Sequence, residues 1–154
     1  IYTDGSSRGN PGPGGYGIVM IAVGQNFKKE FSQGYRKTTN NRMELLAVIE
    51  ALEKIKKDNV KITVFTDSRY VSDAINKNWM AGWIKRKWKN VKNPDLWKRF
   101  LKAYNRTQPK MQWVKGHNDH PINERCDALA VNAALNKASH LVDEGFEAAG
   151  KGLF

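Results

Sequence analysis

The sequence predicts an α/β domain built on a mixed β-sheet with helices on both faces. Three strand-like runs come first, and helical and strand-like patterns then alternate along the rest of the chain. The 154 residues are enough for one domain with a sizeable core. Because no repeat, low-complexity tract or linker divides the chain, we expect a single domain over residues 1–154.

The first half of the chain contains a three-strand meander followed by a helix. Apolar and β-branched runs predict strands at residues 1–4, 16–23 and 27–35, and the short Gly-containing turn at 24–26 makes the last two a hairpin. Apolar residues at helical spacing predict a helix over 41–57. The chain begins inside a predicted strand, so we expect its natural N-terminus to lie further upstream.

The second half alternates strands and helices. Strands are expected at residues 61–66 and 111–114, and helices from Ser68, over 94–104 and over 124–138. Pro94 suits the first turn of its helix, where its missing N–H is not needed. We expect a flexible tail over about residues 145–154, which are rich in Gly and Ala.

Four acidic residues stand at the beginnings or ends of different predicted elements. Asp4 and Asp67 each follow a strongly apolar run, where an unpaired charge would be costly, while Glu44 and Asp127 lie in predicted helices. Ligands of open α/β sheets bind beyond the carboxyl ends of the strands. If the four carboxylates converge there, they form a cage for hard divalent cations, which prefer oxygen ligands.

The positive charge is concentrated in one segment. The chain carries a net charge of +11, and residues 77–110 hold eleven basic residues and one acidic residue, together with four of the five tryptophans. Cations neutralise phosphates while aromatic rings pack on sugars or bases, so this segment predicts nucleic-acid binding. The alternative, a solvated helix with Trp in the core, remains open for some of these residues.

Other global features exclude several classes of protein. Within these residues, no apolar run approaches membrane-spanning length and no signal-peptide pattern occurs. The single cysteine, Cys126, excludes an intrachain disulfide and suits a reducing compartment. We therefore expect a cytoplasmic protein that does not bind membranes.

Six motifs in register resemble bacterial-type ribonuclease HI. They lie at residues 3–6 (TDGS), 9–12 (GNPG), 39–45 (TNNRMEL), 66–68 (TDS), 113–117 (WVKGH) and 123–127 (NERCD). The resemblance covers nearly the whole chain. It implies an RNase H-like fold whose five strands lie in the order 3-2-1-4-5, with only strand 2 antiparallel. It also implies an endonuclease that cuts the RNA strand of RNA/DNA hybrids with two Mg²⁺ ions, which Mn²⁺ can replace, and that acts as a monomer.

The resemblance assigns roles to the acidic residues. Asp4 would bridge both ions, Asp67 and Asp127 would hold the ion that activates water, and Glu44 would hold the ion facing the leaving group. His117, in a Gly-flanked loop, would assist proton transfer or product departure. Glu124 is a candidate outer-shell metal partner, and the alternative is an acid that the helix dipole favours at a helix N-terminus.

The same resemblance implies contacts to each strand of the hybrid. Small and polar residues would contact the RNA strand and the minor groove: Gly5, Ser7, Asn10, Asn40 and Asn41. Others would contact the DNA sugars and phosphates: Lys37, Thr39, Tyr70, Trp79 and Asn93. The basic segment would add Trp83, Lys85, Arg86 and Lys87, and the helix that begins at Ser68 would add Arg69. Arg69 stands where close bacterial relatives usually have Gln. For Asn40 and Asn41, helix capping is the alternative.

Other functions remain open at this point. Integrases and Holliday-junction resolvases of the same fold also cage metals with carboxylates, but lack the paired Asn40–Asn41 and the Trp-rich basic segment. A non-catalytic hybrid-binding module would not need all four carboxylates. A retroviral-type domain cut from a polymerase is a variant of the main interpretation.

Overall fold

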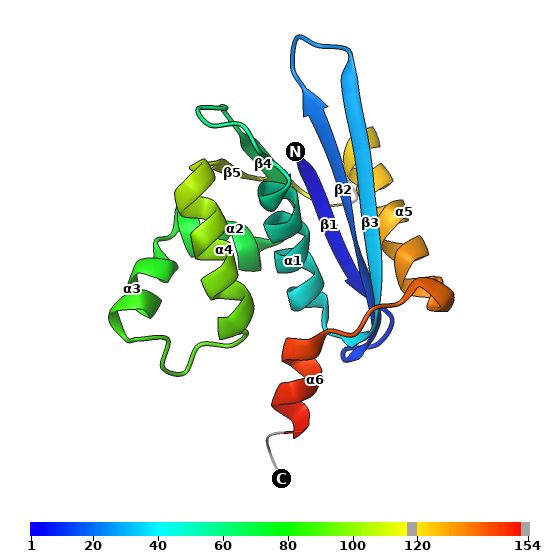
Figure 1. The fold of residues 1–154 in the computed structure, drawn as a ribbon, viewed down its shortest axis with the longest axis vertical. Coiled ribbons are helices and arrows are strands. Elements are labelled where there is room, and N and C mark those ends of the chain that lie inside the picture. Colours follow the sequence, from blue (N-terminus) through cyan, green and yellow to red (C-terminus); the bar gives the residue numbers. More distant parts are fainter. Residues whose placement is uncertain (117–119, 152–154) are drawn as a thin grey trace.

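Five strands form one mixed sheet in the order β3-β2-β1-β4-β5 in the computed structural model, which describes residues 1–116 and 120–151 (Figure 1). β2 runs antiparallel to β1 and β3, while β4 is parallel to both β1 and β5. This arrangement confirms the predicted strand order. The strands are β1 (Tyr2–Ser7), β2 (Gly12–Ala22), β3 (Phe27–Thr38), β4 (Thr63–Thr66) and β5 (Lys110–Trp113).

Helices cover both faces of this sheet, as predicted (Figure 1). One face carries α1 and α2, with α3 and α4 beyond them, and the other face carries α5. Their bounds are α1 (Asn40–Glu53), α2 (Arg69–Asn76), α3 (Trp79–Lys85), α4 (Pro94–Thr107) and α5 (Pro121–Leu135). A 3-10 turn (Lys137–Ser139) and α6 (Glu144–Lys151) follow.

The main core lies between the sheet, α1 and α4. α1 is enclosed by β1 and β2 on one side and by α4 on the other, so apolar residues occupy most of its circumference. Leu45, Ile49 and Leu52 of α1 have no exposed surface, nor do Trp97 and Phe100 of α4. This packing holds α1, and therefore Glu44, rigidly against the central strand.

The helix α5 lies very close to the sheet because glycines line the facing surface of β2 and β3. A Cβ atom added at Gly15 would lie 2.6 Å from the carbonyl oxygen of Ala130, and one at Gly17 would collide with the carbonyl oxygen of Cys126. Gly34 of β3 meets Ala133 in the same way. The alanine-rich face of α5 therefore rests directly on the strand backbone.

The C-terminal segment packs on the edge strand β3. Leu141 pairs with Tyr35 in an isolated parallel bridge, and its backbone exchanges hydrogen bonds with Gly34 and Arg36 at 3.0 Å. Asp143 then accepts from Phe146 N–H at the start of α6, and Arg36 pairs with Glu147. An α-helix thus stands over residues 144–151, where the sequence predicts a flexible tail, because these polar contacts order it.

Several element boundaries also differ from the prediction. β2 begins at Gly12 because its first glycines pair in the ladder although they carry no strand signal, and β3 extends to Thr38 because Thr38 pairs with Gly12. α5 begins at Pro121 because His120 caps it, with Nδ1 accepting from Asn123 N–H. The seven-residue α3 is too short to show a clear helical period, and the sequence does not predict it.

Among the described residues, no helix is both long and apolar enough to cross a membrane.

Candidate active site

Three carboxylates converge where the parallel pairing of the central strands β1 and β4 ends. Asp4 lies in β1, Glu44 in α1 and Asp67 directly after β4, and one oxygen from each lies within 4.8 Å of the others. β1 and β4 are parallel neighbours, so both bring their acidic residues to the same edge. Gly5 lets α1 approach, because a Cβ at this position would lie 2.7 Å from the Cα of Glu44.

The electrostatics of this cluster disfavour full ionisation. Burial, followed by the charge of Asp67, raises the pKa of Asp4 to about 9. Burial also raises the pKa of Glu44 to about 7, against the opposing hydrogen bonds from Ser68 and Asn40. Clustered carboxylates of this kind are stabilised when a cation lies between them. An all-oxygen, partly buried donor set of this kind fits Mg²⁺ or Mn²⁺.

Asp127 faces the same cluster from α5, but it does not belong to the 4.8 Å group. Its charge is one of the causes that raise the pKa of Asp4. Glu124 lies one turn earlier and is exposed in the first turn of α5, the position that the helix dipole favours for an acid. His117 lies outside the described residues. Its neighbour Gly116 packs on Asp67, since a Cβ there would lie 2.7 Å from Oδ2.

The loop after β1 is tied to the carboxylates through two asparagines. The Oδ1 atom of Asn10 accepts from the backbone N–H of Asn40 at 3.0 Å, and the Nδ2 atom of Asn40 donates to Glu44 at 3.3 Å. Thr39 is the cap of α1, with Oγ1 accepting from Arg42 N–H. The capping alternative for Asn40 and Asn41 is therefore wrong, and Asn41 is exposed. Of the remaining predicted contacts, Gly5 is buried in β1, Ser7 ends β1 and Lys37 is exposed on β3.

The aromatic residues of the basic segment divide into two groups. Trp83 packs on the fully buried Trp97 with ring centroids 4.9 Å apart, so the core interpretation holds for these two. Trp79 is 43% exposed, which leaves its ring accessible. The cations that follow α3 or end it are exposed; they are Lys85, Arg86 and Lys87.

Arg69 stacks its guanidinium on the ring of Trp113, 3.8 Å from the centroid. The indole N–H of Trp113 in turn donates to the backbone carbonyl of Asp67 at 3.1 Å. This contact connects α2 to β5 beside the carboxylate cluster.

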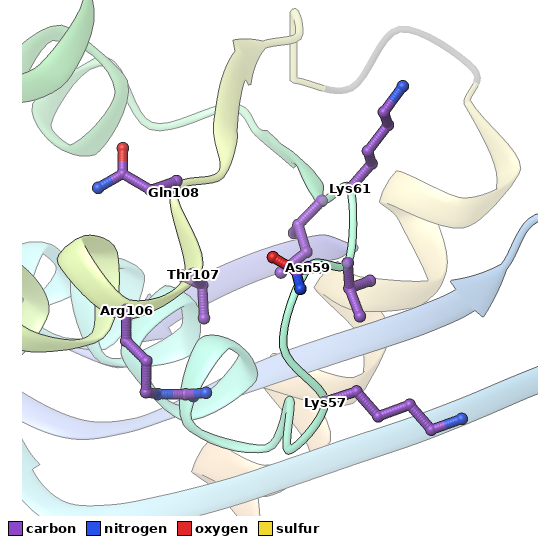
Figure 2. A pocket seen from close by; sticks show the side chains of 8 residues that line it. Lys57, Asn59, Lys61, Arg106, Thr107 and Gln108 are labelled. Carbon is purple, nitrogen blue, oxygen red and sulfur yellow. The ribbon is translucent and has the colours of Figure 1, made fainter.

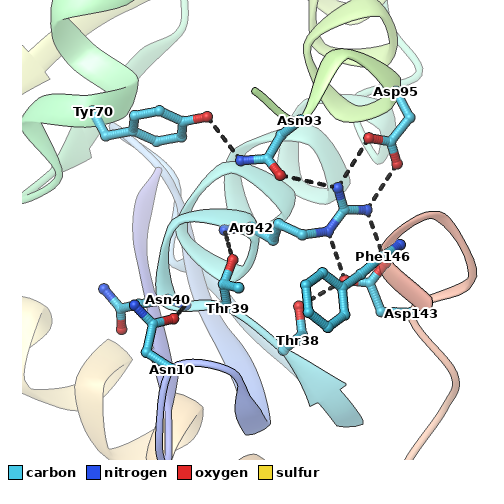
Figure 3. A network of polar contacts seen from close by, with 10 residues as sticks. All are labelled: Asn10, Thr38, Thr39, Asn40, Arg42, Tyr70, Asn93, Asp95, Asp143 and Phe146. Atoms are coloured by element: carbon cyan, nitrogen blue, oxygen red, sulfur yellow. Dashed lines mark hydrogen bonds and ion pairs between the residues drawn. The ribbon is translucent and has the colours of Figure 1, made fainter. Parts of the chain in front are cut away.

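A buried arginine network is the main feature that the sequence does not reveal (Figure 3). Arg42 is 3% exposed and pairs with Asp95 of α4 and with Asp143 of the C-terminal segment. Its hydrogen bonds hold the pKa of Asp95 below its usual range. Arg42 also donates to Asn93, which donates to Tyr70. The signal was present in the TNNRMEL motif, but the partners of Arg42 are distant in sequence.

A surface pocket of about 370 Å³ lies away from the carboxylates (Figure 2). Lys61 and Ile62, which line it, precede β4, whereas Asp67 follows the opposite end of that strand. None of the predicted site residues lines this pocket. The candidate site is therefore a set of side chains across a surface, which suits a long ligand better than a small molecule.

A mixed sheet in this order, with acidic side chains gathered around its two central strands, defines a class of α/β domains suited to divalent cations. The RNase H family model matches residues 1–135. Ribonuclease H of Pseudoalteromonas atlantica is 53% identical over 152 residues, covering 96% of each chain. The chain therefore belongs to the RNase H family of enzymes, and its resemblance to bacterial-type ribonuclease HI is confirmed.

Solved structures agree with this family and with the fold. LC9-RNase H1, described as a type 1 RNase H with the type 2 active-site motif, has a TM-score of 0.76 and 34% identity, covering 96% of this chain and 78% of that one. LC11-RNase H1, solved in complex with an RNA/DNA hybrid, has a TM-score of 0.63 and 30% identity, covering 86% of this chain and 94% of that one.

Proposed function

We propose that this protein is an endonuclease that hydrolyses the RNA strand of RNA/DNA hybrids. The observation that carries the proposal is the convergence of Asp4, Glu44 and Asp67 within 4.8 Å in a member of the RNase H family. The relative LC11-RNase H1 was solved with such a hybrid. The net charge of +11 suits a polyanionic substrate of this kind.

Asp4, Glu44, Asp67 and Asp127 would hold two Mg²⁺ ions, with Mn²⁺ able to replace them. Bound divalent ions supply a nucleophilic water at neutral pH and neutralise the charge that develops on the leaving 3′ oxygen. Asp4, the most buried of the three clustered carboxylates, would serve both ions. The products would carry 5′-phosphate and 3′-hydroxyl ends.

Two further residues would assist the reaction without binding the metal ions directly. His117 would move a proton or help the product to depart. Glu124, exposed one turn before Asp127, would act as an outer-shell partner through water.

Hybrid recognition would use the wide minor groove, which exposes the 2′-hydroxyl of the RNA strand. Asn10 is hydrogen-bonded to Asn40, and Asn40 to Glu44. Contacts of these asparagines with the RNA strand would therefore position that strand relative to the carboxylates. Readout in a minor groove is degenerate, and little sequence specificity follows. The predicted cytoplasmic location and monomeric state can be tested by fractionation and by light scattering.

The test is a cleavage assay with strand-labelled substrates. An RNA/DNA hybrid, duplex RNA, duplex DNA and single-stranded RNA are incubated with the protein in Mg²⁺ or EDTA. We expect Mg²⁺-dependent cutting confined to the RNA strand of the hybrid, abolished by Asp67→Asn. The matched control is Asp58→Asn, which makes the same chemical change at an exposed position before β4 and should cut normally. Hybrid binding without cutting by the unmodified protein would indicate the non-catalytic module.

A further inference from the structure

The hydroxyl group of Tyr70 has an unusual set of partners. It accepts a hydrogen bond from Asn93 Nδ2 at 3.0 Å and a second from the indole Nε1 of Trp97 at 2.9 Å. A phenolic oxygen offers two acceptor positions and one proton, so both acceptor positions are occupied. Among residues 1–116 and 120–151, no acceptor for the proton itself lies within hydrogen-bonding distance. The Tyr70 hydroxyl is therefore restricted to donating, and its acceptor must come from outside the described protein.

The orientation of Asn93 is determined by Arg42. The Oδ1 atom of Asn93 accepts from Arg42 Nη1 at 3.3 Å, and a flipped amide would place two donors against each other. Figure 3 shows the amide between the two side chains, with oxygen toward Arg42 and nitrogen toward Tyr70. The Nδ2 atom keeps a second N–H after its bond to Tyr70.

Arg42 itself cannot rotate. All five of its N–H donors are engaged: two with Asp95 at 2.9 and 2.7 Å, two with Asp143 at 2.8 Å each, and one with Asn93. Both the guanidinium and Asp143 are buried. Asp143 lies beyond the residues that the family model matches, so the C-terminal segment takes part in this arrangement.

We propose that Tyr70 donates its hydroxyl proton to a phosphodiester oxygen of the bound DNA strand, and that Arg42 is a positioning residue that fixes Tyr70 and Asn93 as donors. The inference rests on the proposed function and goes beyond the ring-to-sugar packing that the family resemblance implies for Tyr70. Phosphate oxygens are the strongest acceptors along a nucleic-acid strand and carry no sequence information. The Tyr70 hydroxyl and the free N–H of Asn93 are two neutral groups that can only donate, which suits such an oxygen.

The first test removes only the hydroxyl. Tyr70→Phe should raise the dissociation constant for an RNA/DNA hybrid about tenfold, as expected for one hydrogen bond to a charged acceptor, with a larger change in KM than in kcat. The matched control is Tyr104→Phe, which removes a hydroxyl from the same aromatic cluster, where Tyr104 stacks on Phe100. The control should bind like the unmodified protein. An unchanged dissociation constant for Tyr70→Phe would overturn the proposal.

The second test locates the acceptor. Hybrids whose DNA strand carries one methylphosphonate at successive positions lose a single phosphate oxygen each. The unmodified protein should show a binding penalty at one position that Tyr70→Phe does not show. Equal penalties in both proteins at every position would exclude a phosphate as the acceptor.

The third test addresses Arg42. Arg42→Lys removes the planar set of five donors, so the Asn93 amide is no longer held in one orientation. In this background, Tyr70→Phe should raise the dissociation constant by less than about threefold. If this variant does not fold, Asn93→Asp replaces it: the second carboxylate oxygen would accept the Tyr70 proton, and Tyr70→Phe should then add nothing. If Tyr70→Phe still raises the dissociation constant tenfold in whichever of these two variants folds, Arg42 does not position Tyr70. Because binding is measured without cleavage, the outcome is independent of whether the protein cuts the hybrid.

Discussion

At the scale of single residues, the carboxylate cluster opposes folding when no cation is bound. Asp4 is only 7% exposed and faces Asp67, Asp127 and Glu44. The raised pKa of Asp4 measures the cost of ionising a carboxylate among others in a site of low polarity. Residues that suit the proposed chemistry are therefore unfavourable for stability, a compromise common at functional sites.

This conflict predicts that Asp4→Asn stabilises the protein in EDTA while abolishing cleavage. The folded-state pKa of Asp4 is about 9, above the ordinary value near 4 in an unfolded chain. Below pH 4 Asp4 is protonated in both states and costs nothing, and the destabilisation grows as the pH rises toward 9. Between pH 4 and pH 9 we expect the gain in the free energy of unfolding to grow by up to about 1.4 kcal/mol per pH unit, with almost none at pH 4.

Thermal or urea unfolding across pH measures this gain. Addition of Mg²⁺ should stabilise the unmodified protein and leave Asp4→Asn nearly unaffected. A variant less stable than the parent at every pH would show that Asp4 is held mainly by favourable contacts, such as the bond from Gly5 N–H.

At the scale of elements, the contact of α5 with β2 depends on missing side chains. Gly17→Ala places a methyl group against the Cys126 carbonyl and the Leu129 side chain, and buried backbone cannot yield easily. We expect a loss of about 3 kcal/mol in unfolding free energy. Gly82→Ala is the control: its Cβ meets nothing within 4 Å and lies in α3, so it should stabilise the helix by about 0.5–1 kcal/mol. Equal effects in denaturant unfolding would contradict this account of α5.

The sequence predicts these elements unevenly. Periodicity locates α4 and β4, which bury a well-defined face and run. It also locates α1, whose helically spaced apolar residues continue over several turns although most of its circumference is buried. The strand order came from the family resemblance, since strand pairing is a long-range property that periodicity does not carry. The sequence does not predict α3, which is too short to show a helical period. It does not predict α6 either, because contacts of Asp143 and Glu147 with arginines far away in sequence order that helix.

The candidate site was predicted better than its supporting contacts. The acidic residues could be found because a charge at the end of an apolar strand needs a reason, and the motifs stand in register. The cap of α1 was assigned to Asn40 or Asn41 as an alternative, but Thr39 holds it. The Arg42 network could not be predicted, since a buried arginine and its two aspartates are paired by tertiary structure alone.

At the scale of the whole molecule, positive charge is found both beside the basic α3 region and around the pocket of Figure 2. Only the first group is predicted to contact the hybrid. Replacement of Lys85, Arg86 and Lys87 by Gln should flatten the dependence of log binding constant on log salt concentration by about 2–3 units, since each phosphate contact contributes roughly 0.9.

The matched control makes the same change in net charge in the segment before β4, at the end of that strand away from the carboxylates. Replacement of Lys56, Lys57 and Lys61 by Gln should leave this salt dependence nearly unchanged, because two of these lysines line the distant pocket. Titrations of fluorescent hybrid at several salt concentrations distinguish the two variants. Equal slopes would mean that overall charge, and not the α3 region, governs binding.

The pairing of Leu141 with β3 has a consequence for how this protein behaves at high concentration. β3 is an edge strand, and edge strands offer unpaired backbone groups on which another chain can add and begin an aggregate. Leu141 already uses the outward N–H and C=O groups near Gly34 and Arg36. Toward the hairpin, the strand exposes Lys28, Lys29 and Glu30. The segment that supplies Asp143 to Arg42 therefore also blocks this part of the β3 edge against intermolecular strand addition.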